Sequence, residues 1–581
     1  MKIKHLFGLA VIAAMTASCS SNEDLGTAGP GTGTNEAGVG YAIFTINLPS
    51  VSGTRAADAG GAEMAEGTPE EYKVSNATAL IFQKYGSDEG SYKFVESVTL
   101  PIDGWTDDST PGITTTSKKL VAKLTNVDTK NDYSVLILLN NKNVNLPTVG
   151  QSYNDWNSKN ILTPLVTDWA GSDGFYMANA PLKGSAASPA TLVHIDKNKI
   201  YASETEANNS TNACAATVYV ERGVAKMTVA DPGTKTVTDK ATTKPTKSQV
   251  TFSNWALDIT NKKTYAVHNI DGLSTDFPAI WDTNPSNRFI GTNNRVYWGK
   301  DSNYDNVDLK KNDATGDDLR GKEFNFITAT SEINKDFTTT TTTNPVYCLE
   351  NTFNLANMYQ GQTTRVIFKA TYAPKNATGE SLAEPDGTFY TIGNMTTILK
   401  ETALETAVNT AATSVLPGCT VDYTNLKQEG SHVITLADIK DSTGTTLVAD
   451  KVYSGKPGTQ IVKEINDKLG LIDGAGHTEA MVGINTYARG VTYYIARVKH
   501  FGSLTPWNSG ESYGTANEKY LGRYGMLRNN WYDLTVGNVY GPGYPGVPPV
   551  DPNQPDDENE KYLSVSVKIL SWAKRSDTVD L

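Results

Sequence analysis

The sequence is short of the residues on which most enzyme and metal sites depend. Its 581 residues include four cysteines and six histidines, with no CxxC pair, Cys/His cluster, HExxH motif or phosphate-binding glycine loop. If a leader ending before Cys19 is removed, three widely spaced cysteines remain, at 214, 348 and 419. At most one disulfide is then expected, and buried free thiols are favoured. We therefore expect no catalytic residues, no metal site and no cofactor.

Clustered positive charge and long apolar runs are missing as well. The net charge is −12, and no stripe of Lys or Arg is interleaved with aromatic side chains. Such a chain repels phosphate backbones, which argues against nucleic acid as a partner. Beyond the first residues, no segment is apolar for long enough to cross a bilayer. We expect any membrane attachment to depend on a lipid.

The first residues have the pattern of a secretory signal peptide. Two lysines precede an apolar run over residues 6–15 that is too short to span a bilayer. Small residues stand directly before Cys19, as in a bacterial lipobox, although Thr16 replaces the commoner Leu. Removal of residues 1–18 and acylation of Cys19 would anchor the precursor firmly in a membrane. The alternative is ordinary signal cleavage, with Cys19 incidental.

The length of the chain and its abundant residue types favour an all-β protein of two domains. The chain exceeds a single core of roughly 100–200 residues, and it is rich in Gly, Thr, Asn and Tyr. The Asn-rich stretch at residues 206–212 is the expected boundary, which gives domains at 56–212 and 213–540. Alternating or continuous β-branched and aromatic residues predict strands at 77–83, 133–139, 217–229, 364–372 and 491–498. Apolar residues at helical spacing predict minor helices at 396–412 and 460–469.

A strand is predicted near the start of the chain, over residues 41–48. Its apolar residues alternate with polar or smaller ones, the period of a half-buried strand. They are Ala42, Phe44, Ile46 and Leu48. The residues that follow are small, polar and acidic, which is typical of an exposed loop.

Arg55 is the only Lys or Arg between Cys19 and Lys73. A protease that cuts after Arg would therefore find one site in this loop. Cleavage would remove residues 19–55, including the predicted strand, and leave Ala56 as the new first residue. The alternative is that Arg55 is a solvated loop charge.

A second strand with one apolar face is predicted at the other end of the chain. Residues 541–561 hold many prolines and a cluster of acids, which predicts an extended, semi-rigid linker. A strand follows within residues 562–581, and its alternating apolar residues are Leu563, Val565, Val567 and Ile569. We expect this strand to be held away from its own body. The alternative is that it folds back into its own domain.

The two predicted strands suggest polymerisation. An unpaired strand with four apolar side chains seeks a sheet edge, because its hydrogen-bonding ladder is open. Loss of the strand at 41–48 would leave a groove of matching chemistry for the C-terminal strand of another copy. Because the donor is separated from its own body, an open head-to-tail filament is the expected product.

Several segments together resemble the fimbrillins, the type V pilins of the Bacteroidota, and most closely the shaft subunit of the short fimbria. They are the lipoprotein leader, LPSVSGTRAAD, VYVERGVAK, VYCLENT, TRVIFKATY, RYGMLRNNWYDLTV, the Pro-rich linker and SVSVKILSW…VDL. The resemblance implies two transthyretin-like β-sandwich domains, cleavage between Arg55 and Ala56 by an Arg-specific protease, and a donor strand at 562–572. It further implies a surface fimbrium of self-associated copies, with accessory tip and anchor subunits. A tip adhesin, or a monomeric surface glycan-binding lipoprotein, are the alternatives.

Three short motifs have enzyme-like or metal-like patterns without the context that such sites need. GESYG at 510–514 lacks the strand and helix of a nucleophile elbow, and the prolines of GPGYPG at 541–546 forbid a dinucleotide-type helix start. DSNYDNVD at 301–308 resembles a calcium loop, but Asn306 replaces the turn glycine. In RNNWYDLTV, Trp531 and Tyr532 are expected to pack in a core.

Overall fold

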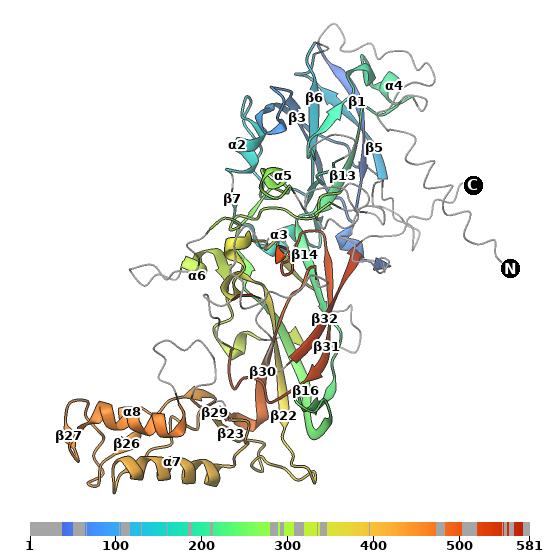
Figure 1. Cartoon of the computed structure of the whole chain (residues 1–581). Helices are drawn as coiled ribbons and strands as arrows, with labels where there is room; N and C mark the ends of the chain where they lie inside the picture. The colour runs from blue at the N-terminus through green and yellow to red at the C-terminus, as the bar shows by residue number, and fades with distance from the viewer. Residues whose placement is uncertain are drawn as a thin grey trace, which may run out of the picture.

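The structure is a computed structural model of the chain. It describes residues 38–49, 64–65, 67–103, 105, 117–128, 130–159, 161–183, 189–209, 213–278, 289–290, 295–306, 309, 319–333, 335–336, 345–393, 395–471, 483–501, 520–548, 550, 555–556 and 563–572. The described chain is mostly β-strand, arranged as two large sheets that follow one another along an elongated molecule, with a helical insert at one end (Figure 1). This confirms the predicted all-β class with minor helices.

The first sheet holds the N-terminal strand in its interior. Its order is β12-β1-β13-β10-β6-β3-β4, with β5 paired to β1 and β11 to β6. The strands are β1 (Gly40–Asn47), β3 (Ala77–Gln83), β4 (Lys93–Thr99), β5 (Ser117–Leu124), β6 (Tyr133–Leu139), β10 (Met177–Asn179), β11 (Val193–Ile195), β12 (Ile200–Tyr201) and β13 (Ala216–Arg222). Side chains from β1, β3, β5, β6 and β13 share one large apolar core. Strand β6 is buried over its whole length, as its continuous apolar sequence predicts.

The second sheet holds the C-terminal strand near one edge. Its order is β2-β32-β31-β15-β16-β22-β30, with β14, β20 and β21 attached. The strands are β2 (Met64–Ala65), β14 (Val224–Val229), β15 (Thr234–Thr238), β16 (Pro245–Asp258), β20 (Lys335–Asp336), β21 (Val346–Leu349), β22 (Arg365–Ala373), β30 (Val491–Arg497), β31 (Trp531–Val539) and β32 (Leu563–Trp572). A separate apolar core lies on this sheet.

The chain passes from the first sheet to the second at Gly223. The prediction of a single strand over residues 217–229 is therefore wrong. These residues form two strands, β13 and β14, which belong to different sheets. A Cβ atom at residue 223 would lie 2.6 Å from the ring of Trp169, so only glycine fits where the chain crosses. The structure thus changes sheet after the predicted boundary at 206–212.

A helical insert projects from the second sheet between β22 and β30, which pair directly with each other. It contains β23 (Phe389–Ile392), α7 (Glu401–Val415), β25 (Gly430–His432), α8 (Gly458–Leu469) and β29 (Ile484–Tyr487). The two helices lie where the sequence predicted helices at 396–412 and 460–469, and they pack on their own apolar core. The insert lies at the far end of the molecule from the first sheet (Figure 1).

The helices outside the insert are short. They are α2 (Tyr153–Asn157), α3 (Val166–Trp169), α4 (Glu204–Ala207), α5 (Leu273–Asp276) and α6 (Leu319–Glu323). Among the described residues, no helix has the length and apolar character that crossing a membrane requires.

Candidate strand-exchange site

Strand β1 is held on both of its edges. Along one edge it pairs antiparallel with β5 over all eight of its residues. Along the other edge it pairs antiparallel with β12 at Tyr41 and Ala42, and parallel with β13 from Phe44 to Asn47. Removal of β1 would therefore open a slot inside the first sheet, with unpaired backbone groups on both walls.

Side chains of β1, together with Leu48 directly after it, fill the core of the first sheet. Ala42, Phe44, Ile46 and Leu48 are at most 1% exposed and lie in the large core, as their alternation predicts. On the opposite face, Ile43 packs against Ala207 of α4. Burial of the three large inner side chains is worth roughly 4.5–9 kcal/mol at about 1.5–3 kcal/mol each, before ordering costs. The slot is thus strongly apolar, and leaving it empty would be costly.

Strand β32 pairs with β31 of its own chain. The antiparallel register places Val565, Val567 and Ile569 opposite Val536, Leu534 and Tyr532. The side chains of Val536, Leu534 and Tyr532 on β31 are buried in the second core. Leu563 lies opposite Val539, which is also buried. The predicted strand is therefore present, and its apolar residues occupy positions that match the buried face of β31.

The structure differs from the expectation that the C-terminal strand is held away from its body. The described parts of residues 541–561 lie against the second sheet, and Tyr544 bridges to Tyr493 of β30. Two tyrosine hydroxyls donate to carbonyls of this segment, Tyr487 to Gly543 at 3.0 Å and Tyr494 to Gly541 at 2.8 Å. The two hydroxyls satisfy backbone carbonyls of this Gly- and Pro-rich segment, so the segment can dock on the sheet without forming a regular strand. The segment is thus docked over its described length and is not an extended spacer.

The acceptor and donor strands lie in different sheets. Strand β1 belongs to the first sheet and β32 to the second, and no pairing joins them in the described part of the chain. Residues Cys19, Arg55 and Ala56 lie outside the described residues, but the strands on either side of the predicted cleavage bond are described. They are β1, which ends at Asn47, and β2, which begins at Met64.

A buried ion pair, missed in the sequence, anchors the chain just after β2. The Glu71 carboxylate is fully buried and lies 2.8 Å from the ammonium of Lys226 on β14. It also accepts a hydrogen bond of 2.6 Å from the Tyr347 hydroxyl. The backbone carbonyl of Glu71 accepts a bond of 2.9 Å from Arg222 on β13. One residue thus ties the N-terminal segment to both sheets.

The start of β31 takes part in the same junction. The Lys226 ammonium lies 3.5 Å from the centroid of the Trp531 ring, a cation–π geometry. Trp531 and Tyr532 are buried, which agrees with the packing role expected for the RNNWYDLTV segment. The Trp531 indole N–H donates to the Thr228 hydroxyl at 2.7 Å. The partner strand of β32 is therefore packed directly beside the anchor of the N-terminal segment.

The enzyme-like and metal-like motifs do not form sites where they are described. Asp301, in the calcium-like loop, is buried and accepts bonds from the backbone of Asn303 (2.7 Å) and of Thr352 (2.8 Å). Burial raises the pKa of this carboxyl to about 7. Its oxygens are thus used in holding loops together. Within the described ranges, no cluster of His, Cys, Asp and Glu side chains is arranged to hold a metal ion. The GESYG motif lies outside them, and GPGYPG runs along β30.

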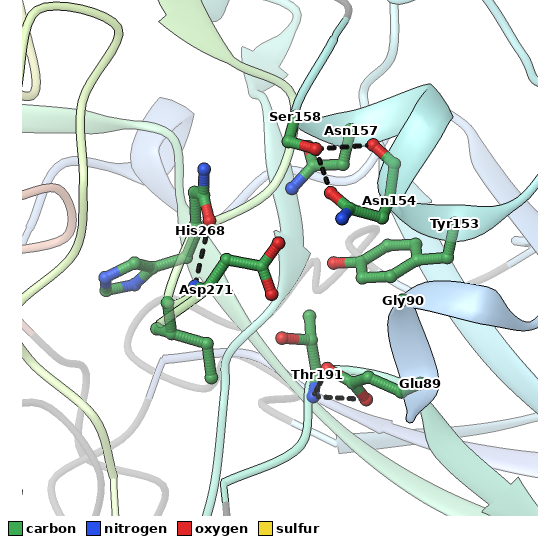
Figure 2. Close-up of a pocket in the computed structure, with 11 residues that line it drawn as sticks. Glu89, Gly90, Tyr153, Asn154, Asn157, Ser158, Thr191, His268 and Asp271 are labelled. Atoms are coloured by element: carbon green, nitrogen blue, oxygen red, sulfur yellow. Dashed lines mark hydrogen bonds between the residues drawn. The ribbon is translucent and has the colours of Figure 1, made fainter. Parts of the chain in front are cut away.

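A small polar pocket lies in the first sheet's half of the molecule, lined by Glu89, Tyr153, Thr191 and Asp271 among others (Figure 2). Its free space is about 20 Å³, which is enough to hold ordered water. The Glu89 carboxylate accepts bonds from the backbone N–H groups of Thr191 and Leu192 (Figure 2 draws the first), so it connects two loops.

Burial of Glu89 predicts a pH-dependent stability. Desolvation raises the pKa of Glu89 from 4.5 to about 7, so between these pH values the folded protein binds a proton that the unfolded chain does not. The free energy of unfolding should therefore fall as pH rises through this window, by up to about 1.4 kcal/mol per pH unit. Urea unfolding at pH 5 and pH 7.5 should show a smaller fall for Glu89→Gln. Equal falls in both proteins would contradict the assignment.

One family model matches the C-terminal region of the chain. Residues 485–578 match the sequence model of "Major fimbrial subunit protein type IV, Fimbrillin, C-terminal". This range contains β30, β31 and β32. None of the curated proteins matches the chain at a significant level.

Two solved structures are similar to the chain over most of its length. One is a candidate cell adhesion protein from Parabacteroides distasonis, with 10% identity and a TM-score of 0.38, covering 92% of this chain and 99% of that one. The other is the tip fimbrial protein Mfa3 from Porphyromonas gingivalis with a C-terminal truncation, with 9% identity and a TM-score of 0.30, covering 92% and 100%. At these TM-scores neither likeness establishes a shared fold.

Proposed function

We propose that the chain, whose residues 485–578 match the fimbrillin C-terminal model, is the shaft subunit of a bacterial surface fimbrium. It polymerises head to tail when β1 is removed by an Arg-specific protease and β32 of another copy takes its place. The precursor is a lipoprotein of the outer membrane, acylated at Cys19. The filament supports adhesion and carries accessory tip and anchor subunits.

The observation that carries this proposal is the position of β1. Strand β1 is paired on both edges, and it and the residue directly after it supply four apolar side chains to the core, so its removal leaves a slot that requires another strand of the same period. Strand β32 has ten residues against eight in β1, and its apolar residues alternate in the same way. Its register on β31 is also consistent with one apolar face. These properties support β32 as the replacement.

Strand exchange at the β1 slot requires proteolysis first. In the precursor, β1 is part of the same chain as its slot, so its effective concentration is on the order of millimolar or higher. An incoming strand of a second copy is dilute by comparison, and it offers Val and Ile where β1 buries Phe44. Competition alone would therefore leave the slot occupied. Cutting the chain after Arg55 removes the covalent advantage of β1.

The shaft role is favoured over the tip role by the presence of a complete C-terminal strand. A tip subunit only has to accept a strand, whereas a shaft subunit has to accept one and donate one. A monomeric glycan-binding lipoprotein would keep β1 in its mature form, whereas the proposed shaft subunit loses it.

The first amino acid of the surface form tests the proposal. We expect N-terminal sequencing of assembled filaments to give Ala56. Filaments whose subunits still begin at Cys19 and retain β1 would refute the proposed assembly.

A further inference from the structure

The short strand β2 lies on the outer edge of β32. It pairs parallel with the end of β32, with Met64 opposite Ser571 and Ala65 opposite Trp572. In the sheet order β2-β32-β31, β2 therefore covers an edge of the C-terminal strand that would otherwise be open at this end. In Figure 1, β32 runs beside β31 in the middle of the molecule.

A rigid anchor holds the chain directly after β2. The backbone N–H of Gly67 donates to the Tyr72 hydroxyl at 3.3 Å, and a Cβ atom at residue 67 would collide with the Glu71 carboxylate. Glu71 is fixed by Lys226 at 2.8 Å, and the Tyr72 ring lies 4.7 Å from the Arg222 guanidinium. Breaking such a buried pair costs several kcal/mol, so the anchor persists when the chain is cut upstream.

In the precursor, β2 is tethered on both sides. Glu71 fixes the chain after it, and β1, embedded in the first sheet, fixes the chain before it. The predicted cleavage bond at Arg55 lies between β1 and β2 in sequence. Cleavage would remove one of the two tethers. Unpaired β2 would then have more conformational freedom, so its pairing with β32 would cost more entropy and become weaker.

We propose that β2 is an autoinhibitory clasp, which holds β32 on its own β31 in the precursor and loosens when the chain is cut after Arg55. This inference rests on the proposed function, since it assigns the clasp to the strand that is donated. One cut then has two effects: it opens the acceptor slot of a subunit, and it frees the donor strand of the same subunit. Precursors that still carry β1 are kept from donating as well as from accepting.

Hydrogen exchange of the uncut monomer tests the clasp. In an Arg55→Lys background, which an Arg-specific protease does not cut, Met64→Pro with Ala65→Pro removes both backbone donors of β2. Exchange over residues 563–572 should become about three- to tenfold faster, while exchange over Gly40–Asn47 should not change. The control, Met64→Thr with Ala65→Thr, keeps the backbone donors and should exchange like the parent.

Unchanged exchange over residues 563–572 in the proline variant would overturn the clasp. A second measurement uses the mature protein: chains that begin at Ala56 and keep β2 are compared with chains that begin at Gly67 and lack it. The chain without β2 should polymerise with a shorter lag, and equal lags would also count against the clasp. If neither chain polymerises while the exchange result holds, the proposed function fails and the clasp stands.

Discussion

Precursor carrying Arg55→Lys is expected to remain monomeric in the presence of an Arg-specific protease that converts the parent protein into filaments. The effect should be all or none, because an embedded β1 leaves no edge for an incoming strand. The lysine keeps the positive charge, so a loss of assembly would report the missing cut and not a missing charge. Electron microscopy and sedimentation would measure filament formation.

A lysine-specific protease supplies the matching rescue. Under limited digestion it should cut the Arg55→Lys precursor after residue 55 and restore assembly. Lys73→Ala is a suitable control, since it removes the next basic residue along the chain and should leave Arg-dependent assembly intact. Filaments formed by uncut Arg55→Lys precursor would show that β1 does not block assembly.

The strands that matter most were predictable because alternation reports which face of a strand is buried. Ala42, Phe44, Ile46 and Leu48 lie in the core as their spacing predicts. Alternation does not report which strands become neighbours, since pairing depends on residues far away in the sequence. This is why the break at Gly223 was missed, and why the pairing of β32 with its own β31 was given only as an alternative.

The anchor at Glu71 shows a second limit of sequence reasoning. Glu71 lies in a small, acidic stretch that has the composition of a solvated loop, and its partner Lys226 is 155 residues away. A signal was nevertheless present on the other side of the pair. Arg222 and Lys226 stand in strands whose β-branched and apolar residues predict burial, and buried charges require partners. The docked segment at 541–548 was missed for a similar reason, because its hydrogen-bond donors come from Tyr487 and Tyr494.

The donor role of β32 predicts a second large effect, which depends on the face of the strand. Val567 lies opposite the buried Leu534, whereas its neighbour Ser566 lies opposite the exposed Thr535. Val567→Asp would have to bury a charge in any slot shaped like that of β1, at a cost of several kcal/mol. We expect this variant to be cut normally but not to donate its strand, with filament yield lowered at least about a hundredfold. Ser566→Asp adds the same charge one residue away and should assemble nearly normally.

Mixing separates donation from acceptance. The Val567→Asp subunit keeps an intact slot after cleavage, so it should accept a strand from the parent protein and then end the filament, because it cannot continue the chain. Filament length measured by electron microscopy should therefore fall as its share in a mixture with parent protein rises. Filaments of ordinary length from Val567→Asp alone would exclude β32 as the donor. If the mixture shows no shortening, the variant has also lost the ability to accept a strand. A folding defect in the first sheet would then explain both results better than a defect of the C-terminal strand.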